Sequence, residues 1–258
     1  MATQPRRYGD GLGQGANSVL GKTRLILEAF ALDDVHLSLT ELSRRTGISK
    51  ASVHRLAQEL LDWGMLERSG QEYRLGMRAF ELGSRVPRFR VLRDAARPFM
   101  ESLHFTTKEV VLLYVPDGLD LLCLEKIASG PEAAKPSRIA RRVPLYCTSG
   151  GRAILAYSPA SFVEEVLTSE LVRLTPSTIV APGLLVEQLK RVRVNHYATE
   201  TEEVVQGYCS VSVPIFSNSE FLVGALSIVV PTFRADVPKL ARALLATSGR
   251  LSRSTLLN

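Results

Sequence analysis

The sequence predicts an α+β protein with a winged helix-turn-helix domain at its N-terminal end and a larger domain of mixed helices and strands after it. Two observations predict this fold class. Residues 18–76 hold three segments with the apolar spacing of helices, followed by two short extended segments. Beyond residue 109, strand-like apolar runs stand at both ends of a helical middle. We divide the chain into a disordered tail (1–17), the winged domain (18–76), a linker helix (77–92) and a second domain (93–258).

Composition and length indicate a globular chain of one or two domains. The 258 residues are 45% hydrophobic and 22% charged, with a mean hydropathy of +0.07. No run approaches the roughly 20 apolar residues that cross a bilayer, and the opening residues hold no apolar secretion signal. We therefore expect a cytoplasmic protein without a membrane partner. Three scattered cysteines are too few for a disulfide framework or a zinc cage. His104 and His196 lack the paired ligands that zinc needs, and neither a metal nor a cofactor is predicted.

The distribution of charge indicates an anionic partner for the first third of the chain. The net charge is +6, and residues 1–92 hold +4 of it. Within residues 40–55, four basic residues stand against the single acidic residue Glu41. A basic excess concentrated on a helix-turn-helix is typical of a double-stranded DNA partner.

Three helices are expected in the winged domain, over residues 18–32, 40–46 and 49–63. Thr40 and Ser49 are predicted as the N-caps of the second and third helices, since their hydroxyls can accept from the first free N–H groups. Gly47 allows the tight turn between these two helices. Gly64 ends the third helix, where a left-handed residue is favoured.

Extended segments and further helices follow along the chain. Residues 65–68 and 72–75 surround Ser69 and Gly70, which is typical of a hairpin. Pro87 lies inside the linker helix, so a kink or a break is expected there. In the second domain we expect helices over 92–103, 149–157, 160–167, 183–195 and 237–252, strands over 110–115, 119–127, 209–216 and 221–230, and a polar loop over 130–142.

The third helix is expected to read DNA. At 100° per residue its apolar side chains share one stripe, which packs inward and leaves the start of the helix for the major groove. Lys50, Arg44 and Arg45 suit phosphate contacts. Arg55 suits either phosphate or a bidentate pair with guanine. Each basic residue taken alone is also typical of a solvated helix surface. The candidate DNA contacts are Thr40, Arg44, Arg45, Ser49, Lys50, Ala51, Ser52, His54 and Arg55, with Arg68 and Arg74 on the hairpin.

Four segments, in order along the chain, carry a resemblance to a known family. Residues 37–76, LSLTELSRRTGISKASVHRLAQELLDWGMLERSGQEYRLG, resemble the DNA-binding domain of the IclR family of bacterial transcription regulators. RVPLYCTSGGRAILAY (142–157), HYATETEEVVQGYCSVSVPIF (196–216) and LVGALSIVVP (222–231) resemble three motifs of its second domain. This chain departs from the family pattern at Arg152, where Lys is usual, and at Ser149, where Ala is common.

The resemblance implies a winged domain joined to a GAF-like α/β effector-binding domain, assembled as a homodimer or a homotetramer. It implies a ligand-responsive, sequence-specific regulator (repressor or activator) of a catabolic operon, not an enzyme, with a small carboxylic or aromatic acid as effector. The N–H groups at the start of the helix at residue 149 suit a carboxylate. By matching to the family motifs, the effector residues are Ser149, Gly150, Glu200, Tyr208, Ser210, Ser227 and Val229.

Two further interpretations concern acidic and nucleophilic residues of the second domain. Glu202 and Glu203 are expected on a solvated face, as charged pairs usually are. An alternative function is a hydrolase-like enzyme with an accessory DNA-binding domain, in which Ser149 or Ser210 is the nucleophile and His196 the base. The chain lacks the G-x-S-x-G elbow of such enzymes, which disfavours this alternative.

Overall fold

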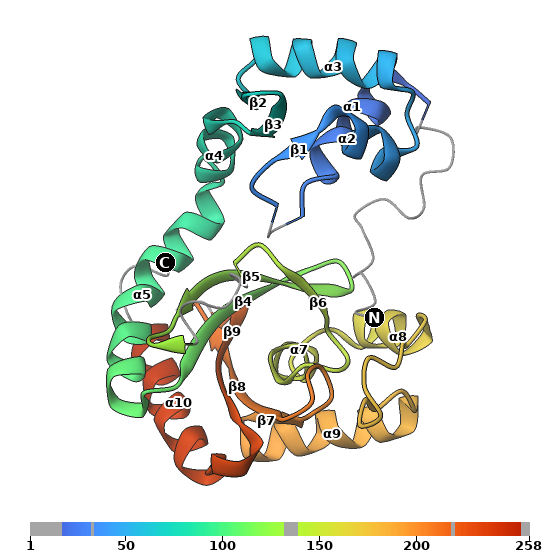
Figure 1. Cartoon of the computed structure of the whole chain (residues 1–258). Helices are drawn as coiled ribbons and strands as arrows, with labels where there is room; N and C mark the ends of the chain where they lie inside the picture. The colour runs from blue at the N-terminus through green and yellow to red at the C-terminus, as the bar shows by residue number, and fades with distance from the viewer. Residues whose placement is uncertain (1–16, 32–33, 132–138, 218–219, 254–258) are drawn as a thin grey trace. The chain divides into compact units, whose positions relative to one another are not determined.

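The computed structural model describes residues 17–31, 34–131, 139–217 and 220–253 (Figure 1). The tail expected over residues 1–17 lies outside this part except for Asn17, as does most of the loop expected over 130–142. The chain divides into two units, with the boundary between Arg90 and Val91. We call them the winged unit and the sheet unit and describe each by itself.

The winged unit packs three helices against a small antiparallel sheet (Figure 1). Its sheet has the strand order β1-β3-β2. Ile26, Leu42, Val53 and Tyr73 belong to its buried core. The elements are α1 (Val19–Glu28), β1 (Leu37–Ser38), α2 (Leu39–Thr46), α3 (Lys50–Asp62), β2 (Leu66–Ser69) and β3 (Glu72–Leu75).

The helix ends of this unit agree with the sequence prediction at α3 and differ at α2. Ser49 caps α3, as predicted, with its Oγ accepting from the Ser52 amide at 3.4 Å. Gly47 and Gly64 are left-handed, with φ of +70° and +77°. The prediction that Thr40 caps α2 is wrong, because Ser38 Oγ accepts from the Glu41 amide at 3.2 Å. The two-residue strand β1 ends at Ser38, so the N-cap of α2 lies two residues earlier than the sequence indicated.

The expected linker helix is two helices with a break before Pro87. They are α4 (Met77–Ser84) and α5 (Pro87–Thr107), and the helix predicted over 92–103 lies inside α5. Pro87 is the first residue of α5, where its missing N–H leaves no intrahelical hydrogen bond unmade. Pro98 lies inside the same helix.

A six-stranded antiparallel sheet forms the centre of the sheet unit, with the order β6-β5-β4-β9-β8-β7. Its two edge strands, β6 and β7, were not expected from the sequence, since they are three and four residues long. The strands are β4 (Val110–Asp117), β5 (Asp120–Ile127), β6 (Arg142–Pro144), β7 (Ala198–Thr201), β8 (Tyr208–Phe216) and β9 (Leu222–Pro231).

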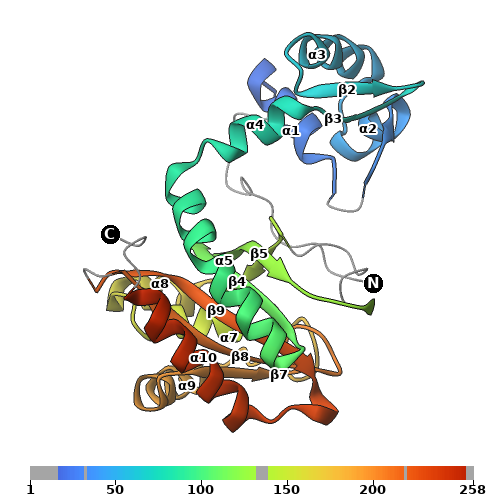
Figure 2. The same cartoon turned by 90° about the vertical axis from the view of Figure 1, so that its left-hand side faces the viewer.

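Helices cover both faces of this sheet. The sheet curls around α7 (Figure 1), and α5 and α10 lie along its other face (Figure 2). Side chains of β4, β9 and α7 share one buried core. The remaining elements are α7 (Ser149–Leu155), α8 (Ala160–Thr168), α9 (Pro182–Asn195), the 3-10 turn η1 (Thr232–Arg234) and α10 (Val237–Ser252). The predicted α+β fold class is confirmed.

Glycines let α7 approach its neighbours closely. A Cβ on Gly151 would stand 1.9 Å from the carbonyl oxygen of Leu145. A backbone shift of a few tenths of an ångström would not relieve this clash. A Cβ on Gly150 would stand 3.1 Å from Leu121 and 3.2 Å from Tyr114. The glycines in the first turn of α7 are therefore required by packing, and they allow Ser149 to lie against the curled face of the sheet.

Candidate functional site

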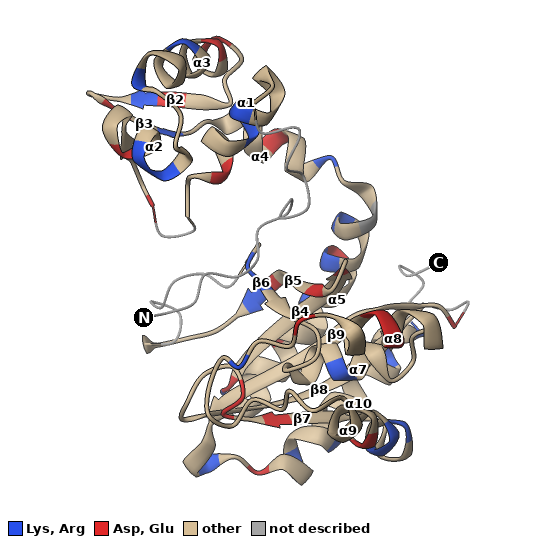
Figure 3. Ribbon diagram, turned by 90° about the vertical axis from the view of Figure 1, so that its right-hand side faces the viewer, with Lys and Arg blue, Asp and Glu red and all other residues tan. Residues whose placement is uncertain are grey.

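The surface of α3 has the arrangement expected of a DNA-reading helix. Val53, Leu56, Ala57 and Leu60 are its buried residues, which confirms the predicted stripe. The candidate contacts at and near its start, Ser49, Lys50, Ala51, His54 and Arg55, are exposed, and Ser52 is half-buried. Figure 3 shows Lys and Arg on α2, α3 and the hairpin, with acidic residues among them.

Several candidate DNA-binding arginines form ion pairs on the surface. Arg55 bonds to Glu59 at 2.7 Å, Arg44 to Glu41 at 2.6 Å and Arg74 to Glu67 at 2.7 Å. Arg68 stacks over the ring of Tyr73 at 5.2 Å. Exposed pairs of this kind contribute about 0–1 kcal/mol, so exchanging the carboxylate for a phosphate costs little. These side chains thus remain suited to DNA contacts.

Arg45 has a different setting from its neighbour Arg44. Its side chain is 26% exposed, and it donates to the carbonyl of Ala29 at 2.9 Å, to Glu41 at 2.8 Å and to Asp34. These contacts tie α2 to the end of α1. Hydrogen bonds from Arg44 and Arg45 lower the pKa of Glu41 to about 2. Arg45 therefore has a structural task that the sequence pattern did not indicate.

A buried chain of hydroxyl groups lies between α7 and the curled face of the sheet. Ser149 Oγ lies 2.7 Å from Ser210 Oγ and 2.6 Å from Ser212 Oγ, and Ser212 Oγ lies 2.5 Å from Ser227 Oγ. Ser210 donates to Glu200 Oε1 at 2.7 Å. We call these four serines, which end on Glu200, the serine chain. The structure thus brings together four of the predicted effector residues.

The serine chain has a direction, because a hydroxyl has one hydrogen to donate. Ser210 donates its hydrogen to Glu200, so it accepts a hydrogen bond from Ser149. Ser149 in turn accepts from Ser212. Burial raises the pKa of Glu200, although bonds from Ser210 and the Glu203 amide oppose the shift. Ser212 was missed in the sequence, although it stands two residues from Ser210 and a strand returns to the same face every second residue.

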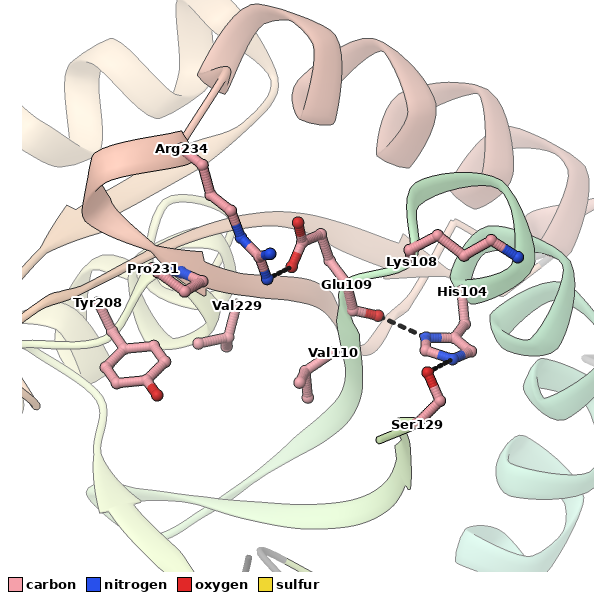
Figure 4. Close-up of a pocket in the computed structure, with 9 residues that line it drawn as sticks. All are labelled: His104, Lys108, Glu109, Val110, Ser129, Tyr208, Val229, Pro231 and Arg234. Atoms are coloured by element: carbon pink, nitrogen blue, oxygen red, sulfur yellow. Dashed lines mark hydrogen bonds and ion pairs between the residues drawn. The ribbon is translucent and has the colours of Figure 1, made fainter. Parts of the chain in front are cut away.

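The predicted residues Tyr208 and Val229 line a pocket (Figure 4). Val229 is paired with Ser210 of the serine chain on the neighbouring strand. The pocket is small, with a cavity volume of about 20 Å³. Arg234 pairs with Glu109 at 2.8 Å on the rim. The lining residues are His104, Lys108, Glu109, Val110, Ser129, Tyr208, Val229, Pro231 and Arg234.

His104 has a tautomer fixed by its partners in this pocket. Its Nδ1 lies 2.6 Å from the carbonyl oxygen of Glu109, which can only accept, so Nδ1 carries a hydrogen. Its Nε2 lies 3.1 Å from Ser129 Oγ. In the neutral ring, Nε2 accepts from Ser129.

The prediction that Glu203 lies on a solvated face is wrong. It is 4% exposed and binds Arg152 through both oxygens, each at 2.6 Å. Arg152 also donates to the carbonyls of Tyr146 and Thr199, each at 3.1 Å. Glu202, with φ of +58°, turns the chain so that the next side chain points inward. The pair fixes α7, which carries Ser149, to the segment that carries Glu200.

The geometry does not form the catalytic pair that the hydrolase alternative needs. Ser149 Oγ is bonded to Ser210 and Ser212, whereas His196 Nδ1 lies 3.1 Å from the hydroxyl of Tyr157. A serine nucleophile needs a hydrogen bond to its own base. The buried cysteines fit packing roles, and burial raises the pKa of Cys147 to about 12.

The described ranges hold neither a membrane-spanning helix nor a cluster of metal ligands. There, no helix combines the length and the apolar character needed to cross a bilayer. Within the same residues, no three His, Cys, Asp or Glu side chains gather as metal ligands would.

Comparison with known proteins decides the family. The description "Bacterial transcriptional regulator IclR C-terminal" matches residues 88–253, and the "IclR helix-turn-helix domain" matches residues 19–70. The chain belongs to the IclR family of bacterial transcriptional regulators. The resemblance seen in its motifs is therefore confirmed.

Individual IclR relatives match over most of their length. The transcriptional regulator KdgR of Escherichia coli is 33% identical over 87% of this chain and 87% of its own. XynR, also of Escherichia coli, is 30% identical over 84% and 87%. A crystal structure of an IclR homolog from Microbacterium hydrocarbonoxydans, complexed with 4-hydroxybenzoate, has a TM-score of 0.84 at 28% identity, covering 91% of this chain and 98% of that one.

Proposed function

We propose that this IclR-family chain is a sequence-specific DNA-binding regulator of a catabolic operon whose effector is a small carboxylic or aromatic acid. It works in the cytoplasm as a homodimer or a homotetramer. The family supports the regulatory role, since relatives such as KdgR and XynR are named transcriptional regulators. The Microbacterium homolog, which was crystallised with 4-hydroxybenzoate, supports an aromatic acid as effector.

The observation that carries the proposal is the combination of two candidate sites in one chain. The start of α3 is exposed and basic, which suits the major groove and its phosphates. The serine chain brings buried hydroxyls next to the apolar side chains of Val110 and Val229 in the pocket, and such a combination is typical of a small-molecule site. A DNA-binding helix and a ligand site together define a ligand-responsive regulator.

Control of DNA binding by an effector requires that the effector bind one of two conformations of the protein more tightly than the other. A ligand that bonds to Ser149 or Ser210 competes with the bonds that these two hydroxyls now make to each other. That competition is a differential interaction of the kind that shifts a conformational equilibrium. Helix α5 begins in the winged unit and continues into the sheet unit, so it is the covalent route between them.

A mobility-shift titration on the DNA upstream of the protein's own gene tests the proposal. Wild-type protein should retard this DNA at lower concentration than a scrambled fragment, and an effector should change the midpoint. Ser149→Leu should keep DNA binding and lose the effector response, because the larger side chain fills the site. Ser102→Leu, on an exposed position of α5, is the matched control.

Two results would contradict the proposal. An equal midpoint on both fragments, with and without added acids, would overturn regulation of the protein's own gene by this route. A Ser149→Leu variant that still responds fully would remove Ser149 from the effector site. If that variant does not fold, Ser149→Val serves the same test with a smaller side chain.

A further inference from the structure

Three side chains of different chemistry form one line along the outward side of α3. At 100° per residue, Ala51, Arg55 and Gln58 fall within about 60° of one another, on the side of the helix opposite its buried stripe. Ala51 and Arg55 are exposed, and Gln58 is half-buried. We call these three residues the reading stripe. It is the part of α3 that can face the floor of a major groove.

The second half of α3 carries acidic residues on its exposed side (Figure 3). Glu59 and Asp62 are exposed there, whereas the basic residues Lys50 and Arg55 belong to the first half. Carboxylates are repelled by the phosphates that form the walls of the groove, so the first half of α3 is the part that enters it. Base contacts are thus confined to residues 51–58. This segment is about 10 Å long, which matches about three base pairs at roughly 3.4 Å each.

Arg55 keeps a free donor edge beside its ion pair. It bonds to Glu59 Oε1 through Nη1, at 2.7 Å. Its Nε and Nη2 can therefore donate side by side, and guanine presents the acceptors N7 and O6 side by side in the major groove. Because Arg55 lies between the other two residues along the helix, guanine is expected in the middle of the three base pairs.

Gln58 and Ala51 flank Arg55, and each suits one base of an A·T pair. Within the part of the chain that the structure describes, the side-chain amide of Gln58 has no hydrogen-bond partner, so its donor and its acceptor are both available. Glutamine pairs bidentately with N6 and N7 of adenine. The methyl group of Ala51 suits contact with the C5-methyl group of thymine. Gln58 was not among the DNA contacts expected from the sequence.

We infer that Gln58 is a specificity-determining residue, and that each operator half-site holds a G·C pair flanked on both sides by A·T pairs. Arg55 reads the G·C pair, and Gln58 and Ala51 read the A·T pairs. The inference rests on the proposed function and adds to it the class of base sequence that the protein recognises. The sharper of the two A·T preferences is expected at Gln58, because two hydrogen bonds discriminate between bases better than one methyl contact.

Selection of binding sites from a library of random DNA duplexes tests this base order. The full-length wild-type protein should enrich an inverted repeat whose half-sites hold a G·C pair between two A·T pairs. Replacing the adenine at the Gln58 position should weaken binding about five-fold or more, the lower end of what one bidentate pair contributes. Enriched half-sites without this order of base pairs would overturn the inference.

Two variants assign the adenine to Gln58. Gln58→Ala should remove the preference for adenine and leave the preference for G·C intact. Gln58→Glu should move the preference from adenine to cytosine, whose N4 amino group donates to a carboxylate. This second variant keeps the size of the side chain, so it serves the test if Gln58→Ala does not fold. Unchanged preference for adenine in the folded variants would overturn the inference.

A matched control is available in the sheet unit. Gln188 is also a half-buried glutamine on a helix, α9. Gln188→Ala should change no base preference. Loss of the adenine preference in this control as well would show that the effect does not arise at Gln58.

The same selection separates this inference from the proposed function. If an inverted repeat is enriched but its half-sites follow another base order, the protein binds specific DNA and only the inferred reading by Gln58, Arg55 and Ala51 is wrong. If no sequence is enriched over the starting library, the proposed function fails, and the inference fails with it.

Discussion

Two arginine–carboxylate pairs of nearly equal length do different work in the two units. On α3, Arg55 and Glu59 are 2.7 Å apart, with side chains 62% and 59% exposed. In the sheet unit, Arg152 and Glu203 are 2.6 Å apart, with side chains 2% and 6% exposed. Water screens the first pair and is excluded from the second. The distance between the charges therefore says little about what each pair contributes.

The difference in burial decides what each arginine is free to do. An exposed pair contributes about 0–1 kcal/mol, so Arg55 can leave Glu59 for DNA. Removing one partner of a buried pair costs about 3–5 kcal/mol, because the other charge is stranded. Arg152 is thus fixed, and with it α7 and the residues around Glu200. The winged unit keeps its arginines exchangeable, whereas the sheet unit uses one to hold its binding site in shape.

The largest effect is expected from breaking the buried pair. Arg152→Met should lower the free energy of unfolding by about 3–5 kcal/mol, because Glu203 is left charged and buried. Urea denaturation measures this change. The double variant Arg152→Met with Glu203→Leu should recover most of the loss. A cost below about 1 kcal/mol for the single variant would contradict the structural role of the pair.

Removing the arginine of the exposed pair should change DNA affinity and leave the free energy of unfolding almost unchanged. Arg55→Ala should weaken operator binding by about 1–3 kcal/mol if Arg55 reads a base, while unfolding changes by less than about 0.5 kcal/mol. Fluorescence anisotropy on labelled operator DNA gives the affinity. Glu59→Gln is the control, and it should leave the affinity unchanged or raise it. Unaltered DNA affinity in Arg55→Ala would show that Arg55 is only a surface residue.

Arg44 and Arg45 allow an exposed and a partly buried arginine to be compared within a single helix. Arg45→Ala should cost about 1–2 kcal/mol of stability, since its charged hydrogen bonds to Asp34 and to the Ala29 carbonyl are lost. Arg44→Ala should stay within about 0.5 kcal/mol. Thermal or urea unfolding of the two variants distinguishes them. Equal costs would mean that the partial burial of Arg45 has no energetic consequence.

The smallest expected effect is the pH dependence of folding stability that arises from Glu41. Arg44 and Arg45 lower its folded pKa to about 2 from its ordinary value of 4.5. A lowered pKa stabilises the fold above the unfolded value, and this contribution is lost as pH falls from 4.5 toward 2. The stability gap between wild type and Glu41→Gln should therefore be full at pH 7 and shrink through that window. A gap that does not change with pH would contradict the pairing.

Local signals in the sequence predicted the elements that are stabilised locally. Ser49 and Gly64 are the ends of α3 because capping depends on neighbouring residues. The last helix, Val237–Ser252, was predicted with the bounds it has. The start of α2 was not, because β1 exists only through its pairing with β3, at Leu37 with Tyr73.

The candidate site was predictable in part and for similar reasons. The family motifs indicated Ser149, Ser210, Ser227 and Glu200, which the fold joins in one hydrogen-bonded chain. Glu203 was misplaced because an acidic residue in a polar run is normally solvated, and its partner is 51 residues away. The pocket rim was missed because α5, β4 and η1 meet there only in the folded chain.

Selection of genomic DNA by the full-length protein tests the central claim most directly. Sheared DNA from the source organism is passed over immobilised protein at about 150 mM salt, where non-specific phosphate contacts are weak. We predict that a few fragments are enriched by about 10³ or more, that they share an inverted repeat, and that Lys50→Ala with Arg55→Ala abolishes the enrichment. Enrichment that is absent, or that is equal for wild type and the double variant, would contradict a sequence-specific regulator that reads DNA with α3.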